Sequence, residues 1–140
     1  MRHDHVAILL SVFVTQLTGF LWYSPALFFG PWARGFGLDP STFQQTDPLV
    51  FVVAIAGSFV AAYTISWLLQ RLDLRGAFSG ARVGFVLWLG LVLPVVWTHY
   101  AFAGLAREHV AIDAGNALLS LLLTGTILGA WRSRAPGGSS

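Results

Sequence analysis

The sequence contains no cysteine, which excludes disulfide bonds, thiolate catalysis and cysteine-ligated zinc. It also contains no lysine, so all eight basic side chains are arginines. Charged residues make up only 10% of the chain, whereas a soluble domain has about 25%. The net charge of +2 is small and the arginines are scattered singly, so the sequence offers no nucleic-acid-binding surface.

Apolar residues, by contrast, make up 56% of the 140-residue chain, more than a soluble domain of this size can bury. They gather in four runs, at 6–23, 49–69, 83–101 and 110–131, and Asp113 is the one charged residue inside them. Each run has about the 17–25 residues that a helix needs to cross a bilayer. The sequence therefore predicts an all-α integral membrane domain of four transmembrane helices, residues 1–131, followed by a disordered tail, residues 132–140.

The first connector, residues 24–48, differs from a disordered linker because it carries five aromatic residues: Phe28, Phe29, Trp32, Phe36 and Phe43. Ser24 before Pro25 is typical of a helix N-cap followed by proline at the first helical position. Asp47 before Pro48 repeats the pattern and predicts the start of the second span. We expect a short interfacial helix around 25–34 with its aromatic side chains toward lipid. The alternative is a loop packed on the outer end of the bundle.

Arginines are distributed unequally between the two ends of this bundle. The N-terminus, the middle connector and the C-terminus share one side and carry six: Arg2, Arg71, Arg75, Arg82, Arg132 and Arg134. The opposite side carries Arg34 and Arg107. Because short loops rich in arginine stay in the cytoplasm, we expect both termini to be cytoplasmic.

A polar stripe runs along the fourth span. At 100° per residue, four polar side chains fall within a sector of about 80°: Asp113, Asn116, Ser120 and Thr124. Such a stripe is costly against lipid, so it should face protein or a wet cavity. Candidate partners for the carboxyl group of Asp113 at the same end are His99, Tyr23, Trp97 and Arg34. The alternative interpretation is that the stripe only holds helices together.

Small residues form two further faces that permit close helix contacts. The opposite side of the fourth span carries Gly115, Gly125 and Gly129, and the second span carries Gly57 and Ser58 between Ala54 and Ala61. Glycine lets two helix backbones approach closely. We expect Gly125 and Gly129 to join this chain to a second copy or to a larger membrane complex.

Proline in the third span predicts a bend. Pro94 has no N–H to donate to the carbonyl group of Gly90, and the missing side chain of Gly90 relieves the steric clash. Bends of this kind occur both at transport sites and in ordinary packed helices.

No pattern of catalytic or metal-binding residues stands out. His99, His109 and Asp113 collect at the outer end and offer three ligands for a divalent metal, but a hydrated loop explains the same cluster, and we predict no metal site. The sequence contains no phosphate-binding loop, dinucleotide fingerprint, nucleophile elbow or HExxH motif. We therefore expect no catalytic residue and no cofactor.

The first connector resembles the hallmark of a bacterial membrane family. The matching residues are Trp22-Tyr23-Ser24-Pro25, Leu27-Phe28, Trp32, Arg34, Gly37-Leu38 and Pro40, followed more loosely by the closing Gly125-x-x-x-Gly129-x-Trp131. This family is known as domain of unknown function 1761. At Phe28-Phe29-Gly30-Pro31 the order departs slightly from the Phe-Gly expected there. The resemblance implies four spans, an ordered first connector and a place in the bacterial cytoplasmic membrane, and it supplies no activity.

Three classes of function fit these observations. The chain is a structural or accessory membrane subunit that acts through helix contacts, which the small-residue faces and the missing chemical motif favour. Alternatively, it is an oligomeric protein that binds or transports a small molecule or ion. The third class is an enzyme at the outer leaflet.

The arginine distribution yields a testable topology. Because the chain has no native cysteine, a cysteine at Ser41 should react with a membrane-impermeant thiol reagent added outside cells, and one at Ser139 should react only after lysis. The reverse labelling pattern would overturn the orientation.

Overall fold

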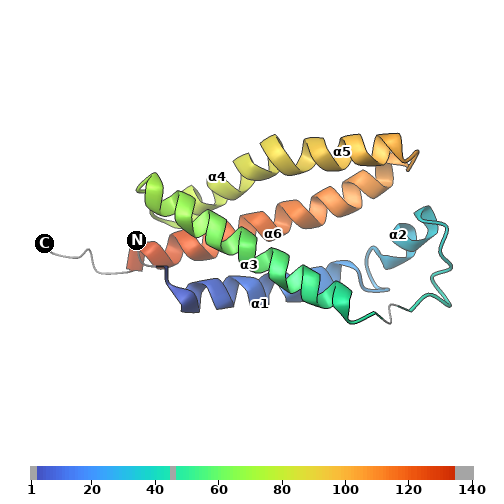
Figure 1. Cartoon of the computed structure of the whole chain (residues 1–140), viewed down its shortest axis with the longest axis horizontal. Coiled ribbons are helices and arrows are strands. Elements are labelled where there is room, and N and C mark those ends of the chain that lie inside the picture. Colours follow the sequence, from blue (N-terminus) through green and yellow to red (C-terminus); the bar gives the residue numbers. More distant parts are fainter. Residues whose placement is uncertain (1–2, 45–46, 135–140) are drawn as a thin grey trace, which may run out of the picture.

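Helices account for nearly all of the regular structure of the chain. The computed structural model describes residues 3–44 and 47–134, and within them it contains no strand. In chain order the elements are α1 (His5–Trp22), α2 (Phe29–Gly35), α3 (Leu49–Arg71), α4 (Ala77–Leu87), the π-helical turn η1 (Trp88–Val92), α5 (Leu93–Phe102) and α6 (Arg107–Arg134). The first long helix, α1, begins at the end of the molecule where the last, α6, finishes (Figure 1).

Four helical segments are long and apolar enough to cross a membrane, which confirms the predicted fold class. They are His5–Trp22, Leu49–Arg71, Ala77–Phe102 and Arg107–Arg134, of 18 to 28 residues. At 1.5 Å per residue these lengths are about 27–42 Å, close to or above the thickness of the hydrocarbon layer. The third segment begins six residues before the predicted position 83. Residues 132–134, assigned to the tail, continue α6, and residues 135–140 lie outside the described part of the chain.

The short helix of the first connector is also present, as α2. It begins at Phe29, later than predicted, because Ser24 accepts turn hydrogen bonds through its carbonyl group and does not cap a helix. Pro31 lies in the first turn, where a missing N–H breaks no helical hydrogen bond. Asp47 does act at the start of α3, since its carboxylate accepts the N–H of Leu49 at 2.9 Å.

The third span changes direction where Gly90 and Pro94 lie. The backbone widens into η1, and the N–H of Leu93 bonds to the carbonyl of Trp88, five residues earlier. Pro94 then occupies the first turn of α5. In Figure 1, α4 and α5 follow each other as one helical segment with a bend between them. The π-turn is the means by which the helix accommodates proline without losing its path across the membrane.

The closest helix contact in the bundle joins α4 to α6 through glycine. A Cβ atom placed on Gly80 would lie 1.8 Å from the carbonyl oxygen of Gly125, and one on Gly125 would lie 2.1 Å from that of Gly80. The N–H of Gly76 donates to the carbonyl of Gly129 at 2.9 Å. The two backbones therefore touch, with no side chain between them.

This contact corrects the expected use of Gly125 and Gly129. Both glycines are buried against α4 of the same chain, so the face has no free surface for a second copy. Their partners belong to the motif Gly76-x-x-x-Gly80-x-x-x-Gly84, which lies largely before position 83, the predicted start of the third span.

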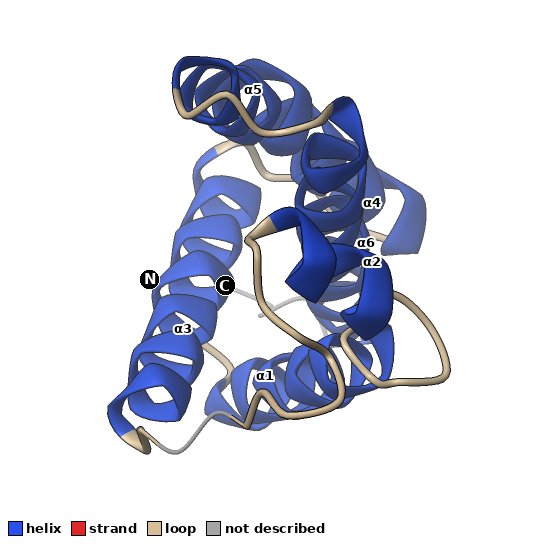
Figure 2. Cartoon of the chain, turned by 90° about the vertical axis from the view of Figure 1, so that its right-hand side faces the viewer, coloured by secondary structure: helices blue, strands red, loops and turns tan. Residues whose placement is uncertain are grey.

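A second packing centre joins α1, α3 and α6. Its buried side chains are Ala7, Ile8 and Val12 of α1, Ala62, Ile65 and Leu69 of α3, and Leu128 of α6. Only the C-terminal part of α3 takes part. Leu49–Gly57 are all exposed, and the end-on view in Figure 2 shows the near, N-terminal end of α3 standing apart from α4 and α6.

Polar side chains close the end of the bundle where α1 begins and α6 finishes. Asp4 caps α1 through the N–H groups of Val6 and Ala7, at 3.1 and 3.2 Å, and its second carboxylate oxygen accepts the indole N–H of Trp131 at 2.7 Å. On the other side Arg132 donates to the carboxylate of Asp73, also at 3.1 Å. The N-terminus of α1 is thus tied to the C-terminus of α6.

The glycine contact predicts a large difference between two identical substitutions. Gly80→Ala drives a methyl group into the backbone of α6 and should lower the free energy of unfolding by about 1–3 kcal/mol. Gly57→Ala meets nothing within 4 Å and should be neutral or stabilising by up to about 1 kcal/mol. Unfolding in mixed micelles of increasing denaturing detergent measures both. Equal effects would show that α4 and α6 are not in backbone contact.

Candidate functional site

Polar side chains from three parts of the chain meet at Asp113, near the start of α6. The hydroxyl group of Tyr23, directly after α1, donates to one carboxylate oxygen at 2.5 Å. The hydroxyl group of Tyr100, in α5, donates to the other oxygen at 2.5 Å. One carboxyl group therefore joins three helices, and we call this arrangement the Asp113 clamp.

Two tryptophans support the clamp from either side. The indole N–H of Trp22 donates to the carbonyl of Ile112 at 3.0 Å, and that of Trp88 donates to the carbonyl of Ala114 at 2.7 Å. Gly115 makes room for the first of these rings, because a Cβ atom there would lie 3.0 Å from Trp22. The residues on either side of Asp113 are thus hydrogen-bonded to α1 and to the third span.

The helix α2 covers the outer end of this group. His109 is 2% exposed, and its Nε2 atom lies 3.1 Å from the carbonyl oxygen of Trp32. Gly35 lies against the same imidazole, where a Cβ atom would overlap the ring. The ring of Phe36 packs edge-on against His109 and Tyr100, with centroid distances of 5.2 and 6.2 Å.

This packing bears on both interpretations of the first connector. The short helix is present, but its Trp32 and Phe36 rings contact protein and do not all point to lipid. Ala33 is completely buried. The connector therefore combines the two interpretations: it contains the predicted short helix, and this helix forms a lid on the end of the bundle where α6 begins.

Two buried polar atoms next to the clamp have no hydrogen-bond partner among residues 3–44 and 47–134: Nδ1 of His109 and Oδ1 of Asn116. The amide of Asn116 lies beside the Tyr23 hydroxyl. Both oxygens of Asp113 are already bonded to tyrosines, so the carboxyl group is satisfied by protein alone. The arrangement is suited to fixing helices and presents no nucleophile beside a base.

The other sequence candidates lie away from the clamp. His99, Trp97 and Arg34 are exposed, Trp97 by 52%, and within the described residues none of them forms a hydrogen bond or ion pair with Asp113. No group of three or more histidine and carboxylate side chains lies close enough to hold a metal within the described ranges. Gly57 and Ser58 lie on α3, which contributes no residue to the clamp. Ser58 accepts a hydrogen bond from the side-chain amide of Gln16 at 2.7 Å.

Tyr100, Trp88 and the lid contact of His109 are not predicted by the sequence. Tyr100 lies directly after His99, which was proposed in its place. The signal for a tyrosine partner was present in the chemistry, because a phenol can donate to a carboxylate without bringing a charge into the membrane.

The clamp predicts different costs for two substitutions of Asp113. Asp113→Leu removes the acceptor for two tyrosine hydroxyls and should lower the free energy of unfolding by about 1–2 kcal/mol, the range of polar contacts between membrane helices. Asp113→Asn keeps a polar acceptor and should cost less. Thermal unfolding in mild detergent compares them, with Asp39→Asn and Asp39→Leu on the exposed connector as controls. A stable Asp113→Leu variant would mean that the clamp does not form.

Comparison with known proteins agrees with the resemblance of the first connector. The family model described as Protein of unknown function (DUF1761) matches residues 6–129, which include all the residues of the Asp113 clamp. No curated protein and no solved structure matches the chain. Because the match extends over far more than half of the sequence, this multi-pass membrane protein belongs to the DUF1761 family.

Proposed function

We propose that this protein is a structural or accessory subunit of the bacterial cytoplasmic membrane, with both termini in the cytoplasm, and that it self-associates through α1 and α3. The observation that supports this proposal most is the exposure of the N-terminal part of α3. Leu49–Gly57 are exposed throughout, and nothing lies within 4 Å of a Cβ atom placed on Gly57. A helix segment whose side chains are all exposed in the described part of the chain can be contacted by another chain.

A polar side chain of α1 also favours contact with another chain at this surface. Gln16 lies within α1 and is only half-buried, and its amide N–H donates to Ser58, whose hydroxyl group donates to the carbonyl of Ala54 at 3.0 Å. The side-chain oxygen of Gln16 accepts no hydrogen bond from the residues described. An amide without a partner in hydrocarbon is costly, so a donor from a neighbouring chain would stabilise it.

A second copy of the chain fits this surface better than an unrelated partner. The side-chain amide of Gln16 has a second N–H and an oxygen that bond to none of the described residues, so two copies related by a twofold axis can satisfy each other. Ala54, Gly57 and Ser58 add a small-residue surface that allows two α3 helices to approach closely. We name Gln16, Ala54, Gly57, Ser58 and Ala61 the α1–α3 face.

Two matched substitutions on α3 test the proposal. Ala54 and Ala56 are both exposed, but they lie two residues apart and so point about 200° away from each other. Ala54→Leu adds bulk to the α1–α3 face and should raise the dimer dissociation constant about tenfold or more, equivalent to ~1.4 kcal/mol. Ala56→Leu adds the same bulk elsewhere and should leave the dimer unchanged. Energy transfer between labelled copies at increasing detergent dilution measures both.

Cysteine cross-linking gives an independent result. Because the chain has no native cysteine, Gly57→Cys should form a disulfide-linked dimer under mild oxidation, whereas Ala56→Cys should not. A chain that stays monomeric at every detergent ratio, or one that two leucine variants affect equally, would contradict self-association through this face. Constant stoichiometry with a different protein, lost in Ala54→Leu, would also contradict it.

A second candidate function is binding or transport of an ion or small polar molecule by the oligomer. The buried and unpartnered atoms of His109 and Asn116 favour it, because such atoms are expected to meet water or a ligand. The paired state of Asp113 argues against it, since the strongest ligand in the group is already in use. If the site binds through its charge, Asp113→Asn should abolish a growth or transport phenotype while leaving the fold intact.

A further inference from the structure

A groove separates the C-terminal end of α3 from the beginning of α4. Its volume is about 420 Å³, within the range of small-molecule sites. Apolar side chains line most of it, among them Leu72, Phe78 and Val86, and the polar lining consists of Ser79 and Arg82. We call it the α3–α4 groove. The helix ends that form it, the end of α3 and the beginning of α4, lie at the end of the bundle where α6 finishes (Figure 1).

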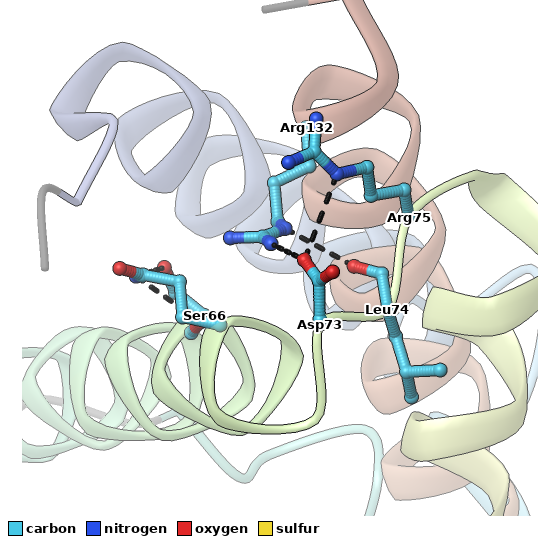
Figure 3. A network of polar contacts seen from close by, with 6 residues as sticks. Ser66, Asp73, Leu74, Arg75 and Arg132 are labelled. Atoms are coloured by element: carbon cyan, nitrogen blue, oxygen red, sulfur yellow. Dashed lines mark hydrogen bonds and ion pairs between the residues drawn. The ribbon is translucent and has the colours of Figure 1, made fainter. Parts of the chain in front are cut away.

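The groove is a fixed feature, because its loop wall is held from α6. The Nε atom of Arg132 donates to the carbonyl of Leu74 at 3.1 Å, and its Nη2 atom donates to the carboxylate of Asp73. Figure 3 shows Arg132 and Arg75 converging on Asp73. Leu74 lines the groove, so the ion pair that closes the bundle also sets the position of this wall.

Arg82 differs from these two arginines, because it has no partner in the described part of the chain. It makes no hydrogen bond or ion pair with any residue between 3–44 or 47–134, whereas Asp73 is shared by Arg75 and Arg132. Arg82 lies five residues into α4 from Ala77, about 7.5 Å along the helix axis. An unpaired guanidinium group at that depth requires an anion or a polar headgroup beside it.

We propose that the α3–α4 groove binds an anionic phospholipid. The phosphate group lies on Arg82, with the Ser79 hydroxyl group as an additional donor, and an acyl chain lies along Phe78 and Val86. A basic residue above an apolar crevice between membrane helices has the chemistry that recognises anionic lipid headgroups. Free inorganic phosphate does not fit, because most of the lining is apolar and would be left exposed to water.

Lipid retention measured by native mass spectrometry tests the site. The protein is purified and exchanged into micelles with equal amounts of phosphatidylglycerol and phosphatidylcholine. The parent chain should retain phosphatidylglycerol preferentially, by about fivefold, as expected for one arginine at a membrane surface. Arg82→Gln should abolish the preference, and Arg82→Lys should keep part of it. Arg134→Gln is the matched control, because it removes an exposed arginine at the same end but outside the groove.

A second variant separates the groove from the charge. Val86 is 58% exposed, so Val86→Trp can fill the groove without disturbing the core, and it should reduce retention of both lipids. Equal retention of the two lipids by the parent chain would overturn the proposal. So would a preference that Arg82→Gln leaves unchanged, or that Arg134→Gln removes equally. None of these results depends on whether the chain forms dimers.

Discussion

The backbone contact between α4 and α6 is the constraint on which the rest of the structure depends. Gly80 and Gly125 allow two helices to touch without side chains between them, and the bond from Gly76 to Gly129 fixes their relative height. Once α4 is placed, the loop before it falls within reach of Arg132, and the third span is directed toward the start of α6. The same contact makes α6 the central helix, with α1 and α3 packed on its remaining surface.

The two ends of the bundle are then secured by polar groups and the middle by packing. At one end the carboxylates of Asp4 and Asp73 collect donors from α6, and at the other the carboxylate of Asp113 collects donors from α1 and α5. This arrangement suits a bilayer, since polar contacts near the interfaces cost less desolvation than contacts at the centre. Gln16 is the exception, and its half-satisfied amide is the reason to expect a partner at the α1–α3 face.

The four spans, the inward-facing Asp113 and its partner Tyr23 were accessible from the sequence, because long apolar runs and isolated polar residues have few solutions in lipid. The sequence did not indicate that Tyr100, and not His99, is the second partner of Asp113. The π-turn at Trp88–Val92 inserts an extra residue into the helix, and each extra residue rotates all later side chains by about 100°. Neighbouring residues in α5 thereby exchange faces. Likewise, Gly76 and Gly80 escaped notice because hydropathy placed the start of the third span too late.

The α3–α4 groove follows from the same glycine contact. Two helices that touch through their backbones lie closer than two that interleave side chains, so α4 is drawn toward α6 and away from α3. Leu74 and Phe78 only partly fill the space that this leaves, because the loop between the helices is short and held by Arg132. Close packing on one side of α4 therefore opens the other side to lipid. Arg82, placed on that open side, forms no ion pair within the described residues, and the phosphate group of an anionic lipid would supply the missing negative charge.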